Sequence, residues 1–376
     1  MESLGLYIHI PFCVHKCAYC DFYSLTDTGL VGKYIAALIT QIKSFRKKAK
    51  KYTVDSVYIG GGTPSSIAAE YICDVMLAVK DTFRLSPTAE ITIEANPGTL
   101  DATKLSVYKS VGINRLSIGL QSADNDELAS LSRIHTWEDF EKSFLLARLE
   151  GFDNISVDLM YALPGQHRST LAKTLETVMD LGPEHISLYG LKIEENTPFG
   201  RDPDIQNSLP DEEKQYKMYM ASAKTLEDHG YMQYEISNFA KPGYECKHNM
   251  KYWRCENYLG FGPAAASLFD GVLFNYMKNI ELFTDDPLTP LLVESSEMLT
   301  EREMATQYVM LGMRLTEGVG REVFRERFGL DLDLEYGQKL APFIEKKLAE
   351  KTEYGYRLTR RGMLVSNYIL SDILDL

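Results

Sequence analysis

Apolar runs rich in β-branched residues recur along the first half of the chain, and each is followed by a polar loop and a stretch with helical periodicity. Such runs predict buried strands, and the periodic stretches predict amphipathic helices. The predicted strands are Leu4–Ile10, Val54–Ile59, Glu90–Ala95, Arg115–Leu120, Ile155–Met160 and His185–Leu191. The predicted helices are Val31–Phe45, Ser66–Phe83, Leu100–Val111, Trp137–Leu149, Leu171–Leu181 and Asp211–His229.

This alternation predicts an α/β fold with a parallel sheet, because each crossover helix returns the chain to lie beside the previous strand. Eight such units would close a full barrel, so six leave either an incomplete barrel or a doubly wound sheet. In both architectures ligands bind at the carboxyl ends of the strands. The residues that follow each apolar run are therefore the candidates for a functional site.

The alternation stops after Gly230, and two further regions follow. Residues 231–290 are aromatic and glycine-rich, and they include a predicted β-hairpin whose Asp270-Gly271 pair suits a type I′ turn. Residues 291–376 are predicted to hold helices, a short pair of strands and a final helix, an order that resembles a winged helix. We expect a barrel over residues 1–230, an aromatic extension over 231–290 and an α-rich domain over 291–376.

Composition and charge narrow the classes of function. The chain has 376 residues, of which 45% are hydrophobic and 25% charged, as in ordinary soluble proteins. Its 40 Lys and Arg against 53 Asp and Glu give a net charge of −13, which argues against a nucleic-acid partner. No secretory signal opens the chain and no apolar run is long enough to span a membrane, so we expect a cytoplasmic protein.

Three of the six cysteines lie close together in the loop after the first predicted strand. Cys13, Cys17 and Cys20 form a C-x3-C-x2-C pattern. In a reducing cytoplasm such cysteines are better metal ligands than disulfides, and three thiolates on one loop can bind three irons of an iron–sulfur cube. The fourth iron would then be open to a ligand. Zinc is the alternative, but structural zinc sites need four ligands and no second C-x2-C occurs. Three unligated core cysteines are a further alternative, which this spacing in a loop does not favour.

The cysteine pattern, with Tyr19 before its last cysteine, resembles the signature of the radical S-adenosylmethionine (SAM) superfamily. The surrounding Tyr7-Ile-His-Ile-Pro-Phe-Cys13 and Cys20-Asp-Phe22 resemble the family of oxygen-independent coproporphyrinogen III oxidase and its heme-chaperone relatives. The resemblance covers nearly the whole chain. It implies a partial (β/α)6 barrel of TIM-like form, a [4Fe–4S] cluster on the three cysteines, SAM on the open iron and a C-terminal domain of the HemN type.

Polar residues at the ends of the other predicted strands fit a site for SAM. A glycine-rich turn follows the second strand, where the backbone can approach a ligand closely, and no Walker phosphate motif accompanies it. A carboxylate inside an apolar strand, such as Asp158, is costly unless it is paired or functional. By resemblance, one SAM molecule, or two as in the oxidase, would be bound by Tyr7, Tyr19, Gly61, Gly62, Thr63, Glu94, Gln121, Arg133 and Asp158.

The segment His248-Asn-Met-Lys-Tyr-Trp253 matches an H-N-x-x-Y-W motif associated with heme binding in the chaperone relatives. A neutral imidazole is a good axial ligand for heme iron, and neighbouring aromatic side chains suit the covering of a macrocycle. The alternative is a hydrogen-bonded structural histidine among core aromatics. The resemblance implies that His248 ligates heme.

Two features favour the chaperone over the oxidase. The oxidase carries a fourth cysteine where this chain has Phe22, and it has an N-terminal extension before the motif. We therefore expect a protein that binds the cluster, SAM and heme and transfers heme to acceptor apoproteins. A one-electron donor such as a flavodoxin-type protein would be a further partner. The alternative is the oxidase of porphyrin biosynthesis, which converts coproporphyrinogen III to protoporphyrinogen IX. Productive cleavage of SAM and peripheral association with a membrane are left open.

Overall fold

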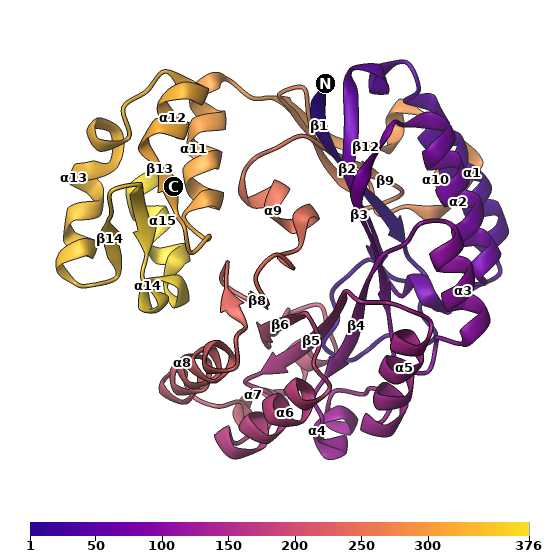
Figure 1. Ribbon diagram of the computed structural model, residues 1–376, viewed down its shortest axis with the longest axis horizontal. Helices are drawn as coiled ribbons and strands as arrows, with labels where there is room; N and C mark the ends of the chain where they lie inside the picture. The colour runs from indigo at the N-terminus through magenta and orange to yellow at the C-terminus, as the bar shows by residue number, and fades with distance from the viewer. Residues whose placement is uncertain (376) are drawn as a thin grey trace.

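The computed structural model describes residues 1–375, and a single curved sheet forms its centre (Figure 1). Six parallel strands pair in the order in which they occur in the chain. A doubly wound sheet would reverse this order near its middle, so the consecutive order identifies an open, partial barrel. The predicted (β/α)6 barrel is confirmed. Its strands are β1 (Glu2–Ile10), β2 (Tyr52–Gly61), β3 (Leu85–Ala95), β4 (Arg115–Gln121), β5 (Ile155–Tyr161) and β6 (His185–Gly190).

Helices follow these strands and cover the outer face of the barrel (Figure 1). Six of them correspond to predicted helices, and α4 and α7 are short additions in the predicted loops. Asp124 and Asp202 cap the first turns of these two helices by accepting hydrogen bonds from backbone N–H groups. The helices are α1 (Val31–Ser44), α2 (Ala69–Thr82), α3 (Ala102–Ser110), α4 (Asn125–Ser130), α5 (Trp137–Leu149), α6 (Arg168–Asp180), α7 (Pro203–Ser208) and α8 (Glu212–Asp228).

The two faces of the parallel strands differ in chemistry. Leu116 and Ile118 of β4, like Val157 of β5, are fully buried in the main hydrophobic core that the strands share with the helices. Because side chains alternate between the faces of a strand, the residues between them face the barrel interior. There the Ser117 hydroxyl donates to the Asp158 carboxylate at 3.2 Å. The polar positions within apolar strands therefore line the inside of the barrel.

Strands from the second half of the chain extend both edges of the sheet. β9 (Tyr258–Phe261) pairs parallel with β1, and β10 (Ala266–Phe269), β11 (Val272–Tyr276) and β12 (Val293–Met298) continue antiparallel. At the other edge, β8 (Asn238–Ala240) pairs antiparallel with β6, and β7 (Met232–Gln233) follows. Residues 231–290, which the sequence sets apart as an extension, thus contribute strands to the sheet of the barrel.

The predicted hairpin is the pair β10 and β11. Its turn residues Asp270 and Gly271 have φ values of 52° and 77°, as a type I′ turn requires.

The C-terminal residues form a helical module with a hydrophobic core of its own. Its small antiparallel sheet has the order β13-β15-β14, and the sequence of helices and strands matches the predicted winged-helix arrangement. β12 still belongs to the barrel sheet, so this module begins at Glu301 and not at residue 291. The remaining elements are α10 (Ile280–Asp285), α11 (Glu301–Gly312), β13 (Val319–Gly320), α12 (Arg321–Phe328), α13 (Leu332–Glu345), β14 (Ala349–Lys351), β15 (Gly355–Leu358), α14 (Arg360–Leu364) and α15 (Ser366–Leu374).

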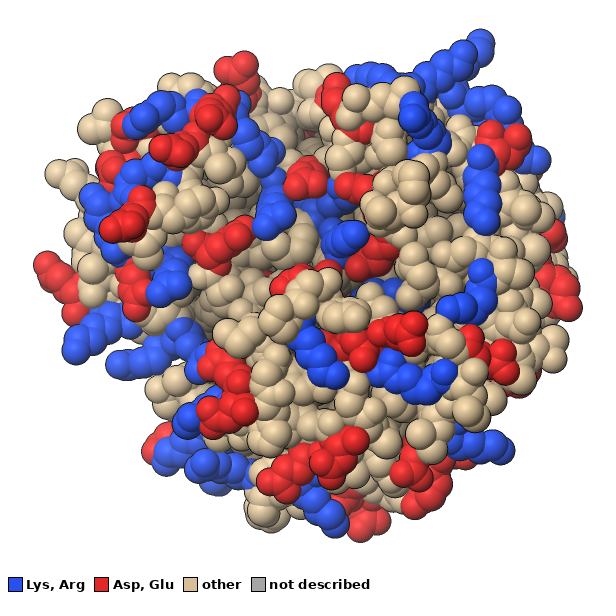
Figure 2. All heavy atoms as spheres, in the orientation of Figure 1, with Lys and Arg blue, Asp and Glu red and all other residues tan. Residues whose placement is uncertain are grey.

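Surface charge and hydropathy add two observations. On the face shown in Figure 2, acidic and basic side chains are interspersed, and neither sign covers a broad area alone. Among residues 1–375, every helix is too short or too polar to cross a bilayer.

Helix α9 (Lys247–Trp253) lies on the inner side of the barrel strands and faces the C-terminal module (Figure 1). It contacts β1 and β2 on one side and α11 on the other. The Arg314 guanidinium lies 5.9 Å from the centre of the Trp253 ring, so this helix connects the barrel to the module.

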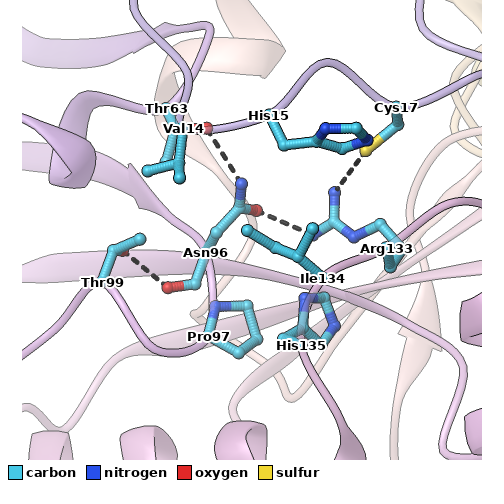
Figure 3. Close-up of a pocket in the computed structure, with 10 residues that line it drawn as sticks. All are labelled: Val14, His15, Cys17, Thr63, Asn96, Pro97, Thr99, Arg133, Ile134 and His135. Carbon is cyan, nitrogen blue, oxygen red and sulfur yellow. Dashed lines mark hydrogen bonds between the residues drawn. The ribbon is translucent and has the colours of Figure 1, made fainter. Parts of the chain in front are cut away.

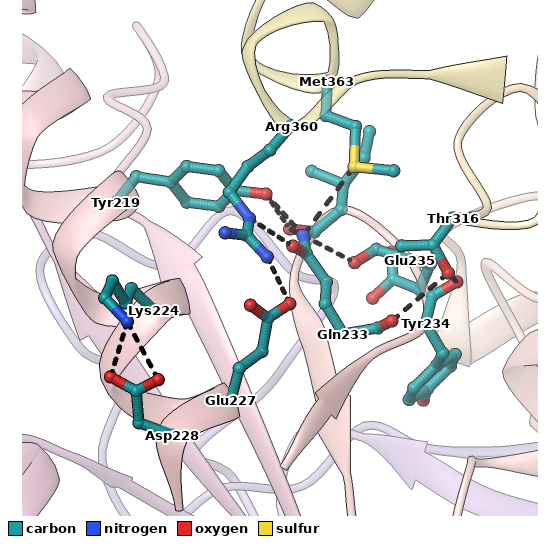
Figure 4. Close-up of polar contacts among 11 residues, drawn as sticks. Tyr219, Lys224, Glu227, Asp228, Gln233, Tyr234, Glu235, Thr316, Arg360 and Met363 are labelled. Carbon is teal, nitrogen blue, oxygen red and sulfur yellow. Dashed lines mark hydrogen bonds and ion pairs between the residues drawn. The ribbon is translucent and has the colours of Figure 1, made fainter. Parts of the chain in front are cut away.

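A second contact between barrel and module surrounds the buried Gln233 side chain (Figure 4). Its amide nitrogen donates to the Tyr219 hydroxyl at 2.6 Å, and its amide oxygen accepts from Arg360 Nε at 3.0 Å. Arg360 also pairs with Glu227 of α8. The Thr316 hydroxyl donates to the backbone oxygen of Gln233 at 3.2 Å. These contacts hold the module against the end of α8.

We expect Arg360→Met to weaken this docking by about 1–2 kcal/mol, because it leaves Glu227 and the Gln233 oxygen without their cation. Denaturant unfolding followed by tryptophan fluorescence would report it, since Trp253 senses Arg314 of the module. Arg361→Met is the matched control because Arg361 is exposed. Equal unfolding midpoints for the two variants would contradict the role given to Arg360.

Candidate functional site

The three cysteines of the predicted cluster lie in a loop that the backbone holds closed after β1. Cys13 N–H donates to the Leu25 oxygen at 2.9 Å, and Leu25 N–H donates to the Pro11 oxygen at 2.6 Å. Cys20 N–H donates to the Cys17 oxygen at 3.1 Å, which turns the loop between them. All three thiols are free. The loop therefore presents three soft ligands at the carboxyl end of the first strand.

The surroundings of the thiols are polar on one side. Cys13 Sγ lies 3.4 Å from the Thr63 hydroxyl, and Arg133 Nη1 donates to Cys17 Sγ at 3.5 Å. Burial raises the pKa of Cys13 and of Cys20, so both thiols must release a proton when they bind a metal.

Within residues 1–375, no three His, Cys, Asp or Glu side chains converge on a point where one metal ion would sit. A [4Fe–4S] cluster sets a different requirement, because each cysteine binds its own iron. Three free thiols on one loop, with a guanidinium beside them, fit that requirement.

The glycine-rich turn after β2 is required by the packing of the protein itself. A Cβ on Gly61, whose φ is +118°, would lie 2.6 Å from the His9 ring, and one on Gly62 would lie 2.8 Å from the Phe12 oxygen. A Cβ on Gly60 would lie 2.9 Å from the Glu94 carboxylate. These glycines let the cysteine loop and Glu94 approach the end of β2, which brings the cluster loop and the strand ends together.

Two carboxylates line the barrel interior beneath the cysteine loop. Glu94 accepts from the Tyr58 hydroxyl at 2.9 Å and from Gly61 N–H at 3.1 Å. Burial, and then the nearby Asp158 carboxylate, raises the pKa of Glu94 to about 7. Burial also raises the pKa of Asp158. The positive charge of Arg115, inside the same barrel, offsets part of the rise in both pKa values. Two partly accessible carboxylates in a confined space are suited to the cationic groups of a ligand such as SAM.

Arg133 joins the cysteine loop to the ends of β3 and β4 (Figure 3). Its Nη2 donates to Asn96 Oδ1 at 2.8 Å and to the Gly119 oxygen at 2.6 Å. Asn96 Nδ2 in turn donates to the Thr63 hydroxyl at 2.9 Å. A small pocket opens here between the loop and the strand ends, lined by Val14, His15, Cys17, Thr63, Asn96, Pro97, Thr99, Arg133, Ile134 and His135.

The structure brings most of the predicted residues to this end of the barrel. Gln121 ends β4 with a φ of +78°, and its amide lies close enough to Gly119 that a Cβ there would meet it at 3.1 Å. Tyr19 packs against Phe199 with ring centres 6.3 Å apart. Tyr7 faces the interior, where its hydroxyl lies 3.0 Å from His9 Nδ1.

Sequence reasoning missed Asn96, which connects Thr63 to Arg133. The available signal was its position directly after Glu94-Ala95 at a strand end, where the same logic that selected Glu94 applies.

His248 stacks on Tyr7 with ring centres 6.5 Å apart, and its surroundings do not fit an accessible heme ligand. The side chain is 1% exposed, and both ring nitrogens have hydroxyl partners: Nδ1 lies 3.0 Å from Ser56 Oγ, and Nε2 lies 2.8 Å from Tyr252 Oη. Ligation of heme iron by His248 stays a prediction.

Comparison with known proteins agrees with the fold and with the cysteine loop. Residues 7–178 match the model of the Radical SAM superfamily, and residues 299–365 match that of the HemN C-terminal domain. The structure of coproporphyrinogen III oxidase (HemN) from Escherichia coli superposes with a TM-score of 0.86 at 23% identity, covering 99% of this chain and 90% of that one. Fold and site thus define a radical SAM protein with a HemN-type C-terminal domain, and they point to a [4Fe–4S] cluster and SAM as its cofactors.

Full-length relatives narrow the class further. The heme chaperone HemW of Bacillus subtilis (strain 168) is 36% identical, and the match covers 98% of this chain and 98% of the relative. HemW of Escherichia coli (strain K12) is 34% identical with the same coverage. The chain belongs to the HemW family of radical SAM proteins.

We expect Cys17→Ser to prevent assembly of a stable cluster, because an alcohol replaces one of the three soft ligands. After anaerobic reconstitution, iron and sulfide content and visible absorbance should fall to near background. Cys73→Ser in α2, away from the loop, is the control and should reconstitute fully. Full iron and sulfide content in Cys17→Ser would show that the three cysteines do not hold the cluster.

We expect Glu94→Gln to gain stability relative to the wild type as the pH rises. The pKa of Glu94 is raised on folding from 4.5 to about 7. Its contribution to stability is therefore fully present below about pH 4.5 and is lost as the pH rises through 7. The free-energy difference between variant and wild type should shift by on the order of 2 kcal/mol between pH 5 and pH 8. Thermal unfolding of the metal-free proteins at several pH values measures this free-energy difference. A difference that does not change with pH would show that folding does not raise the pKa of Glu94.

Proposed function

We propose that this protein is a heme chaperone that binds heme and transfers it to acceptor apoproteins, with a [4Fe–4S] cluster and SAM bound at the strand ends of the barrel. The observation that carries the proposal is the match over 98% of the chain, at 34–36% identity, with proteins named heme chaperone HemW. We expect this transfer of heme to take place in the cytoplasm.

The cysteine loop supports this proposal over the oxidase. Phe22, at the position where the oxidase is expected to carry a fourth cysteine, is 71% exposed and offers no metal ligand. The likeness to the oxidase structure, at 23% identity, concerns the fold alone. A chaperone needs no catalytic group that acts on a propionate side chain.

At the cofactor site, residues of the cysteine loop and of the strand ends would bind the cluster and SAM and orient them. Cys13, Cys17 and Cys20 would hold the cluster, which would supply one-electron chemistry beside SAM once a small electron donor had reduced it. Arg133 holds Cys17 and Asn96 at fixed distances, which keeps the loop against the strand ends. Glu94 and Asp158 would take the cationic groups of SAM from the barrel side.

A direct experiment compares the two functions in one preparation. The reconstituted protein is loaded with heme and mixed with an apo-form of a heme b protein, and the spectrum of the acceptor is followed. Transfer should be faster with the wild type than with Cys17→Ser, which separates assisted transfer from passive loss.

Separately, the protein is incubated anaerobically with SAM, a reductant and coproporphyrinogen III. Catalytic formation of protoporphyrinogen IX would show that the protein acts as the oxidase. Absence of heme binding would refute the proposed chaperone function.

A further inference from the structure

The segment His248–Trp253 belongs to α9 (Lys247–Trp253), which lies on the inner side of the barrel strands, away from the cysteine loop. Its contacts are with residues before or near the middle of the first three strands, namely Gly5 of β1, Ser56 of β2 and Glu90 of β3. A Cβ on Gly5 would lie 2.8 Å from Lys251 Cδ and 3.3 Å from His248 Cε1. The absence of a side chain at Gly5 therefore lets the helix pack directly on the backbone of β1.

His248 is built into this contact by three hydrogen bonds. Its backbone N–H donates to Glu90 Oε1 at 3.3 Å, and its ring nitrogens face Ser56 and Tyr252 at 3.0 and 2.8 Å. Burial, together with the Lys251 charge, lowers the pKa of His248 to about 3, so the ring is neutral. A neutral imidazole has one ring nitrogen with a free lone pair, and here that lone pair accepts a hydrogen bond from one of the two hydroxyls. The same lone pair would be needed to bind iron.

The ring also supports the tyrosines that stand beneath the cofactor site. Tyr58 stacks on His248 with ring centres 5.4 Å apart, and Tyr7 does so at 6.5 Å. The Tyr58 hydroxyl then donates to Glu94 at 2.9 Å, and Glu94 accepts from Gly61 at the end of β2. Two contacts thus connect His248 to the carboxylate proposed to hold SAM.

A buried ammonium fixes the helix in place. The Lys251 side chain is 3% exposed, and its Nζ lies 2.9 Å from Asp55 and 3.0 Å from Glu256. Lys251 also donates to the Ser3 hydroxyl at the start of β1. Breaking such a pair leaves a buried charge without its partner, so α9 leaves the barrel only at a large cost in free energy.

From these contacts we infer that the segment His248–Trp253 is a structural element packed against the inner side of β1, β2 and β3. We infer also that His248 is a positioning residue for the SAM site and not a heme ligand. The inference rests on the radical SAM class of the chain and stands whether or not the chaperone function is correct. The aromatic residues of the segment then have a structural role, in which the Tyr252 hydroxyl orients the His248 ring.

Two substitutions of one residue separate the roles. The amide of Gln reaches the place of Nε2 and keeps the bond to Tyr252, but it is a poor ligand for heme iron, whereas Leu removes every polar contact of the ring. We expect His248→Gln to bind SAM within about threefold of the wild type, and His248→Leu to bind it about tenfold more weakly, as loss of one or two buried hydrogen bonds predicts. Equilibrium binding of SAM to the reconstituted proteins measures both.

Heme titration of the same variants gives the second readout. We expect His248→Gln to keep the heme absorbance of the wild type. Loss of that absorbance in His248→Gln with unchanged SAM affinity would make His248 the heme ligand and overturn the inference. Wild-type affinity for SAM in His248→Leu would also overturn it.

Ser56→Ala covers the case in which His248→Leu does not fold, because it removes only the Nδ1 partner. It should weaken SAM binding severalfold and leave heme absorbance unchanged, and wild-type SAM affinity in Ser56→Ala would count against the positioning role. If the wild type binds no heme, the SAM measurements still test the positioning role while the chaperone function fails separately.

Discussion

The structure depends on the burial of charged and polar groups inside a barrel made of parallel strands. Each strand places every second side chain in the interior, where Glu94, Asp158 and Arg115 lie together. Isolated charges there would cost several kcal/mol each. The interior is held together because hydroxyls donate to the carboxylates and the positive charge of Arg115 acts favourably on both. The outward faces, which pack under the helices, can then be purely apolar and provide the stability of the fold.

The cysteine loop illustrates how closely site and packing are joined. Gly61 and Gly62 look like a ligand-binding turn in the sequence, but the atoms nearest to their missing side chains belong to His9 and to the loop itself. A substitution at either position would push the loop away from β2 before it met any cofactor. The position of the thiols is therefore set by backbone contacts with the neighbouring strand as much as by their spacing along the chain.

The sequence predicted the parallel strands and the cysteine loop because both leave local signals: apolar runs between turns, and three thiols within eight residues. It also selected Asp158, since a carboxylate within an apolar strand needs an explanation. The placement of α9 leaves no such signal. A helix of seven residues has little periodicity, and its partners Gly5, Ser56 and Glu90 come from three distant strands. For the same reason the sequence assigned β12 to the C-terminal domain, because its pairing with β11 depends on a hairpin geometry that composition does not reveal.

The pairing of β9 with β1 has a consequence for how the chain folds during synthesis. β1 is made first, but it gains its second neighbour only when residues 258–261 have been made. Until then its backbone N–H and C=O groups on that side form an unprotected edge, next to the loop that carries the cysteines. A nascent chain of this topology therefore carries an aggregation-prone strand for more than two hundred residues of elongation, and binding by a general chaperone in that interval would protect it.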